Sequence, residues 1–127
     1  MTNILLVGIG GFIGSVMRYL VGGAVQSYMK RLDFPYGTLA VNLIGCFVIG
    51  VLAQYGESRG VFSSESRAFI FIGVLGGFTT FSSFGNDTVN LLRESFVMNA
   101  FLNIGANVLL GLLAIWLGRT ISYLTWR

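Results

Sequence analysis

The stretch with the clearest chemical potential is a glycine pair followed by hydroxyl and phenylalanine side chains. Gly76-Gly77 has a weak preference for helix, and the hydroxyl groups that follow can hydrogen-bond nearby backbone groups. Phe81 and Phe84 are three residues apart, so they share a face if this turn is helical. Together these neutral groups can surround a small anion, because phenyl rings have positive edges and hydroxyls replace part of a hydration shell. The hydroxyl side chains are Thr79, Thr80, Ser82 and Ser83.

This stretch lies in a segment without charge from Ala68 to Asn86, which is nearly long enough to cross a bilayer. We interpret the segment as a membrane helix interrupted near its middle. Irregular backbone at membrane depth persists only where protein buries it or water lines it, and such breaks often mark ion or substrate sites. The alternative is a Gly/Ser/Thr surface that packs against another helix.

Composition places the whole chain in a lipid bilayer. Its 127 residues are 54% hydrophobic and 10% charged, and its mean hydropathy is +0.78, whereas soluble domains carry about 25% charged residues. The eight Lys and Arg residues are scattered, so we expect no nucleic-acid partner. There is no histidine, and the single cysteine, Cys46, lies in an apolar run where packing is its simplest role.

Four apolar segments predict an all-α membrane protein, with four transmembrane helices in a single domain over residues 1–127 and the third helix broken near its middle. Each segment approaches the roughly 20 residues that a spanning helix needs. Because the chain crosses four times, both termini should lie on the same side. The predicted spans are about 4–25, 37–55, 67–89 and 95–118.

The basic residues divide evenly between the two sides. Orientation normally follows an excess of Lys and Arg on the cytoplasmic side, and here there is none. The pattern therefore favours insertion in both orientations over a single orientation set by other factors, and an antiparallel pair of copies would follow naturally. One side holds Arg59, Arg67, Arg119 and Arg127, and the other holds Arg18, Lys30, Arg31 and Arg93.

Polar residues inside the spans leave several roles open. Asn42 can donate to an anion or lock two helices together. Asn99, Asn103 and Asn107 are spaced by four and form one stripe, which we expect to face water or a pore. Arg18 is costly deep in hydrocarbon, so a partner within the protein and a snorkelling position at the interface are equally open.

The spans lack the groups that catalysis or proton transport would need. They hold no buried Asp, Glu, Lys or His, and no triad, metal cluster or phosphate loop is present. The glycine-rich run at 10–14 resembles a dinucleotide loop, but no α/β sheet can follow it. Its glycines more simply allow helices to approach closely. We therefore expect no enzyme, and the neutral donors favour a path for an anion that the residues alone do not identify.

Three motifs resemble the Fluc (CrcB) family of microbial fluoride channels, and together they cover nearly the full chain. They are residues 10–19, 37–45 and 76–84, of which the last is the most specific. The resemblance implies a channel that passively exports cytoplasmic fluoride across the cell membrane, which in a bacterium is the inner membrane. It also implies an antiparallel, dual-topology homodimer with two pores.

The resemblance also implies roles for individual residues. Rings at 81 and 84 would line the pores, Arg18 would act structurally or electrostatically, and Gly76 and Thr79 would offer backbone carbonyls to a central sodium ion. A broken helix leaves carbonyls unpaired, and with no carboxylate nearby sodium suits them better than calcium; hydroxyls or water are the alternative partners. The expected ion path comprises Phe81, Phe84, Asn42, Thr80, Ser82, Ser83 and Asn107.

The sequence departs from the family pattern at two places, and two other functions remain as alternatives. Ser83 stands where threonine is usual, and Gly85-Asn86-Asp87 replaces a usual serine-x-glutamate, which leaves the role of that turn open. A dual-topology multidrug exporter driven by protons would need a carboxylate deep in the membrane, which the spans lack. A non-transporting assembly protein would use the glycines and asparagines for packing alone.

Overall fold

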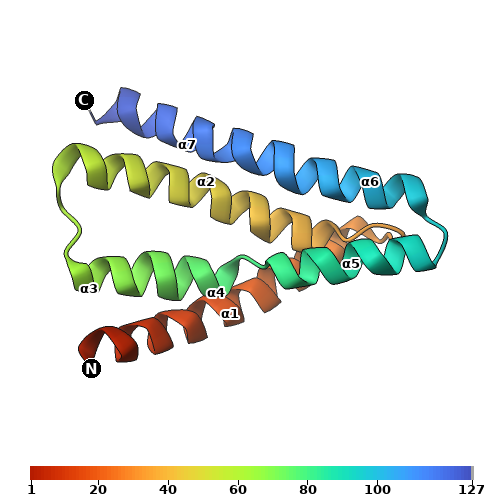
Figure 1. Ribbon diagram of the computed structural model, residues 1–127, viewed down its shortest axis with the longest axis horizontal. Helices are drawn as coiled ribbons and strands as arrows, with labels where there is room; N and C mark the ends of the chain where they lie inside the picture. Colours follow the sequence, from red (N-terminus) through yellow and green to blue (C-terminus); the bar gives the residue numbers. More distant parts are fainter. Residues whose placement is uncertain (127) are drawn as a thin grey trace.

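The computed structural model describes residues 1–126 and consists of four long helical rods (Figure 1). Each rod is long and apolar enough to cross a membrane, which confirms the prediction of an all-α protein with four spans. The rods extend beyond most of the predicted bounds, because the backbone stays helical through the polar residues that flank each apolar stretch. They cover Thr2–Met29, Tyr36–Arg59, Ser64–Arg93 and Val97–Thr125.

The first two rods are single helices and the other two are composite. Both composite rods contain a π-helical stretch, a wider turn that often occurs at functional sites, and the sequence did not predict either one. The elements are α1 (Thr2–Met29), α2 (Tyr36–Arg59), α3 (Ser64–Arg67), η1 (Ala68–Leu75), α4 (Gly76–Phe78), α5 (Phe81–Arg93), α6 (Val97–Gly105), η2 (Ala106–Leu110) and α7 (Gly111–Thr125).

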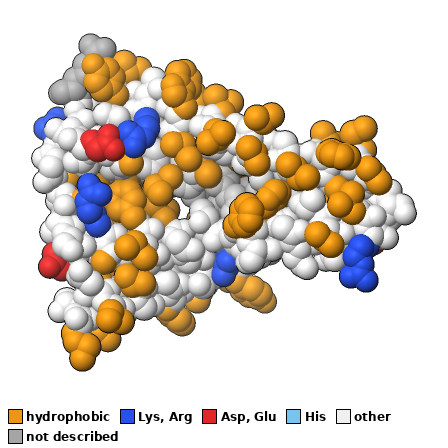
Figure 2. Space-filling view, in the orientation of Figure 1, with side chains coloured by type: hydrophobic (Ala, Val, Ile, Leu, Met, Phe, Trp, Pro, Cys, Tyr) orange, Lys and Arg blue, Asp and Glu red, His pale blue; other side chains and the backbone are white. Residues whose placement is uncertain are grey.

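Both chain ends lie at the same end of the bundle, beside the connection from α2 to α3 (Figure 1). This arrangement confirms the prediction from four crossings. Figure 2 shows apolar side chains along the whole length of one face, while charged side chains gather mainly near the end that holds the termini. Of the basic residues assigned to that end, Arg127 lies outside the described residues.

The third rod is interrupted near its middle, as predicted, and the interruption lies at Thr79 and Thr80 rather than at the glycine pair. Gly76-Gly77 belongs to helix α4, and the extended residues are Thr79 (ψ 156°) and Thr80 (φ −149°). The glycines remain helical because they serve close packing: a Cβ on Gly77 would lie 2.7 Å from the carbonyl oxygen of Gly11 in α1. The packing alternative is therefore correct for the glycines, and the interruption begins two residues after them.

Glycines on both partners bring α1 against the third rod. A Cβ on Gly10 would lie 2.6 Å from the carbonyl oxygen of Phe69, and one on Gly73 would lie 2.9 Å from the Cα of Gly10. Lipid tails are as apolar as leucine, so helices in a bilayer associate through close backbone contact between small residues. Similar contacts hold α2 against α7, where Gly118 lies against the backbone of residues 47–51.

Polar side chains fix the loop between α1 and α2 at the opposite end. Gln26 donates to the carbonyls of Arg31 (2.6 Å) and Phe34 (3.0 Å) and accepts from the N–H of Gly37 (3.0 Å). Arg31 pairs with Asp33 at 2.8 Å, and this hydrogen-bonded guanidinium lowers the pKa of the carboxyl group. The loop therefore sets how α1 enters α2 and where the site residues of α2 lie.

The glycine contact between α1 and the third rod predicts a clear difference between two substitutions in the same helix. Gly14→Ala should lower the free energy of unfolding by about 1–3 kcal/mol, the usual cost of overpacking, because its Cβ would meet the carbonyl oxygen of Val74 and lie 2.9 Å from the backbone nitrogen of Phe78. Gly8→Ala is the matched control, because its Cβ would meet nothing within 4 Å. Thermal unfolding in detergent measures both, and equal stability of the two variants would contradict the packing account.

Candidate functional site

The interruption of the third rod positions two phenylalanine rings. Thr80 caps the first turn of α5, because its Oγ1 accepts from the N–H of Ser83 at 3.2 Å. Phe81 and Phe84 follow in that first turn, with ring centroids 5.4 Å apart and planes tilted by 57°. Phe84 is only 9% exposed, whereas Phe81 is 83% exposed. One ring is therefore held inside the subunit, and the other projects from it.

Asn42 on α2 pairs with the backbone of the interruption at two points. Its Oδ1 accepts from the N–H of Thr80 at 2.8 Å, and its Nδ2 donates to the carbonyl of the same residue at 3.1 Å. The second hydrogen of Nδ2 goes to Oδ1 of Asn107 at 2.9 Å. Asn42 thus locks three rods together, as the helix-locking alternative expected, and its role on an ion path stays a prediction.

The asparagine stripe of the fourth rod faces inward. Asn107, within η2, donates to Asn103 Oδ1 at 3.0 Å, and Asn103 donates to Thr88 Oγ1 at 3.0 Å. Asn103 is 0% exposed, so the expectation of a water-facing or pore-facing stripe is wrong for this residue. Asn99 instead donates to the carbonyl of Asp33 at 2.7 Å and ties α6 to the loop between α1 and α2.

Two carbonyls at the interruption lose their usual helical donors. The N–H of Thr80 donates to Asn42 rather than to Gly76, four residues earlier. The N–H of Ser83 donates to the Thr80 side chain rather than to the carbonyl of Thr79. These are the carbonyls for which the sequence predicted a cation. Their oxygens are available as ligands, because neither receives the N–H four residues ahead.

An open groove of about 380 Å³ borders the interruption. It brings together most of the predicted site residues and is lined by no acidic or basic side chain among the described residues. Cys46, which is half-buried, also lines it, together with apolar side chains from α2 and the third rod. The predicted residues along this groove are Asn42, Gly76, Thr79, Thr80, Phe81, Phe84 and Asn107.

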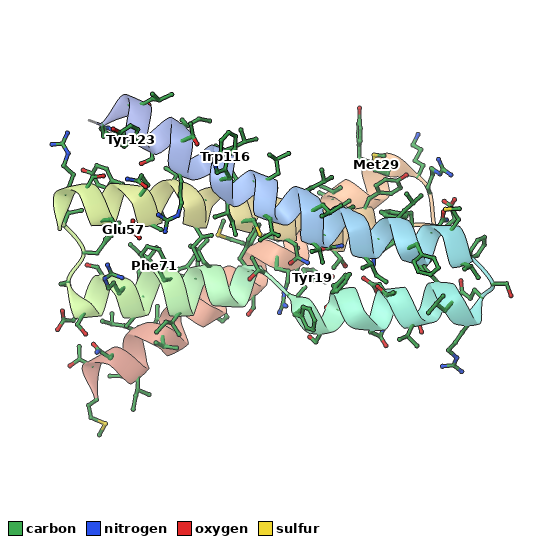
Figure 3. The ribbon with its side chains drawn as sticks, turned by 45° about the horizontal axis from the view of Figure 1, so that its top comes forward. Tyr19, Met29, Glu57, Phe71, Trp116 and Tyr123 are labelled. Carbon is green, nitrogen blue, oxygen red and sulfur yellow. The ribbon has the colours of Figure 1, made fainter. Side chains whose placement is uncertain are left out.

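A second cleft, of about 430 Å³, is also lined by Thr80 and contains Arg18 and Ser83. Arg18 is half-buried, and the ion pairs in the described part of the chain are Arg31–Asp33 and Arg119–Glu57. The guanidinium thus faces a cleft of hydroxyl groups without a carboxylate partner. Tyr19, which borders the same cleft, lies at the level of the interruption (Figure 3).

The two clefts share Thr80, which is 8% exposed. The interruption therefore borders both an apolar groove with phenyl rings and a polar cleft that contains Arg18. Ser82 is exposed and lines neither cleft. Its Oγ lies 3.3 Å from Thr80 Oγ1, and Thr80 Oγ1 also donates to Ser83 Oγ at 3.1 Å.

Sequence reasoning missed three hydrogen bonds of α5. Thr38 of α2 donates to Asp87 at 2.8 Å, which gives the Gly85-Asn86-Asp87 turn a role in joining α2 to α5. Thr88 donates to the carbonyl of Phe84 at 2.8 Å and accepts from Asn103. The Thr38–Asp87 and Asn103–Thr88 pairings depend on how the rods are rotated against each other, so no sequence signal could have found them. The bond from Thr88 to Phe84 lies within α5 and follows the local pattern of threonine in helices.

Comparison with known proteins gives consistent matches over nearly the whole chain. The model of the family described as CrcB-like protein, Camphor Resistance (CrcB), matches residues 5–119. A Methanosarcina barkeri protein named fluoride-specific ion channel FluC 3 is 44% identical over 96% of this chain and 91% of its own. A Methylobacillus flagellatus protein named fluoride-specific ion channel FluC is 44% identical over 93% of this chain and 92% of its own.

Proposed function

This chain belongs to the CrcB family, and from that membership we propose that it is a fluoride-selective ion channel and not an enzyme. Its full-length relatives are named fluoride-specific ion channels, and its four spans make it a multi-pass membrane protein. Its location is the cell membrane, which in a bacterium is the inner membrane. The physiological result would be resistance to fluoride.

The groove beside the helix interruption is the observation that carries this function. It combines two phenyl rings with amide and hydroxyl side chains and has no titratable carboxylate, lysine or histidine along its described lining. Positive ring edges and neutral polar groups can replace part of the hydration of a small anion. A multidrug exporter driven by protons is disfavoured, because it would need a carboxylate at this depth.

Passive flow is sufficient for export. Hydrofluoric acid enters a cell as a neutral molecule and ionises inside, so fluoride accumulates in the cytoplasm. A negative-inside membrane potential favours the exit of an anion by about 2.3 kcal/mol per 100 mV. Arg18, which lines the polar cleft without a carboxylate partner among the described residues, would attract the anion toward the interruption.

The working unit that we propose is an antiparallel homodimer with two pores. Phe81 is 83% exposed beside an open groove, so a second copy would complete the lining. The even division of basic residues between the two ends supports insertion in both orientations. In such a dimer, Ser82 and Ser83 would join Asn42, Thr80 and Asn107 along the ion path.

A central sodium ion would satisfy the carbonyls of Gly76 and Thr79. Neither receives its usual helical N–H, and an unmet carbonyl in lipid costs several kcal/mol. Gly76 is exposed, so two antiparallel copies could bring about four such oxygens around one point. The ion would supply structural support and fixed positive charge while fluoride passes elsewhere.

Fluoride efflux from liposomes that contain only this protein tests the function. We expect efflux of fluoride but not of chloride, and no dependence on a proton gradient beyond its electrical contribution. Phe81→Ile should strongly reduce efflux, because isoleucine removes the ring edge; since Phe81 is 83% exposed, the subunit should still fold. Efflux that stops when a protonophore removes the proton gradient at constant membrane potential would contradict a passive channel.

Charge at the termini tests the antiparallel arrangement. Adding about three lysines to the N-terminus should bias every copy toward one orientation and abolish efflux. Co-expression with a copy biased the opposite way should restore efflux, whereas lysines added to both ends of the bundle serve as the neutral control. Full efflux from a population with a single verified orientation would refute the antiparallel dimer.

Removal of sodium tests the cation site. Replacing sodium with a large organic cation during purification should weaken the dimer and lower fluoride efflux, because the carbonyls of Gly76 and Thr79 would lose their shared ligand. Dimer stability is measured by subunit exchange between differently labelled preparations. Unchanged stability and efflux after verified removal would leave hydroxyls or water as the partners of these carbonyls.

A further inference from the structure

A series of hydrogen bonds crosses the bundle, and every donor in it points the same way, from Thr80 toward Thr88. It begins at Thr88, whose hydroxyl hydrogen goes to the carbonyl of Phe84 at 2.8 Å. With that hydrogen used, Thr88 Oγ1 can only accept, so Asn103 must turn its Nδ2 toward it (3.0 Å). The amide oxygen of Asn103 consequently faces the other way, toward Asn107.

The same argument fixes the orientation of two further amides, those of Asn107 and Asn42. Asn107 donates from Nδ2 to Asn103 Oδ1 at 3.0 Å and so presents its own oxygen to Asn42. Asn42 donates to that oxygen at 2.9 Å and keeps its Oδ1 for the N–H of Thr80 at 2.8 Å. Reversing the polarity would set donor against donor and acceptor against acceptor at Thr80. Thr88 at one end of the series and Thr80 at the other therefore require the same orientation of the three amides between them.

We propose that Thr88 and Asn103 are positioning residues for the ion path, acting by fixing the orientation of the Asn107 and Asn42 amides. Neither residue lines the groove or the cleft of Arg18, and the exposed fractions of Thr88 and Asn103 are 7% and 0%. Asn42 and Asn107 both border the groove. This proposal rests on the channel function proposed above and extends it to two buried residues.

The proposed role follows from what a misoriented amide would do. If Asn42 rotated, its Oδ1 and Nδ2 would exchange places within the lining of the groove, and the partial negative charge of the oxygen would move with it. The N–H and the carbonyl of Thr80 would also lose their partners, and with them the extended backbone that borders both clefts. Fixed polarity therefore maintains both the electrostatics of the groove and the shape of the interruption.

Two substitutions of Thr88 separate the hydroxyl from the volume of the side chain. Thr88→Val keeps the shape but removes the acceptor for Asn103, and we expect fluoride efflux per folded dimer to fall about tenfold. The hydrogen exchange of the Thr80 backbone N–H should become about tenfold faster, because the free energy of one buried hydrogen bond corresponds to a factor of about this size. Thr88→Ser retains the hydroxyl and should restore both values to within about twofold of the original protein.

Thr120→Val is the matched control for loss of a threonine hydroxyl. Thr120 donates to the carbonyl of Trp116 at 2.9 Å, four residues earlier in α7, as Thr88 does in α5. It has no role in the chain of amides, so Thr120→Val should leave efflux and Thr80 exchange unchanged. An equal effect of the two valine substitutions would overturn the proposal.

Hydrogen exchange at Thr80 distinguishes positioning from a general loss of packing. If Thr88→Val lowers efflux while Thr80 exchange stays slow, or changes neither value, the proposal is wrong. If the single variant folds poorly, Thr88→Val with Asn103→Leu removes both buried partners and should recover stability, yet Thr80 exchange should stay fast. Slow exchange in that double variant would also overturn the proposal.

Hydrogen exchange is measurable even if the original protein carries no fluoride, so failure of the channel function would be recognised separately.

Discussion

The constraint on which the structure depends is that backbone polar groups at membrane depth must find partners within the protein. A continuous helix meets it alone, but the interruption at Thr79–Thr80 cannot. Asn42 meets part of the need because a primary amide offers the same donor and acceptor as a peptide group. It pairs with Thr80 at 2.8 and 3.1 Å, as a neighbouring strand would. The position of α2 is thus tied to the interruption.

A second constraint follows from the solvent. Lipid provides little hydrophobic drive for helices to associate, so backbones must approach closely for dispersion and polar contacts to hold them. The glycines of α1, η1 and α4 permit this approach, and the amides of α2 and the fourth rod add directional bonds. The polar groups of the site can therefore hold their geometry without a hydrophobic core of the kind that a water-soluble protein has.

The sequence predicted what depends on local composition and missed what depends on packing. Hydropathy was enough for the four spans, because a bilayer fixes the length of an apolar segment. The weak helix preference of Gly76-Gly77 and the hydroxyl residues after it predicted an interruption near the middle of the third span, and the extended residues Thr79 and Thr80 lie in that stretch. The two glycines stay helical because they pack against α1. The inward orientation of Asn103 depends on rod rotation, which spacing along one helix cannot determine.

The same constraint identifies the groups of one subunit that folding leaves without their usual partners. The Gly76 and Thr79 carbonyls lack their usual helical donors, and the guanidinium of Arg18 faces a cleft without a carboxylate in the described part of the chain. A lone copy would expose such groups to hydrocarbon, at several kcal/mol for each unmet polar group. A second copy, an ion or trapped water would remove this penalty. The groups left unsatisfied by folding are thus the groups that association and ion binding can use.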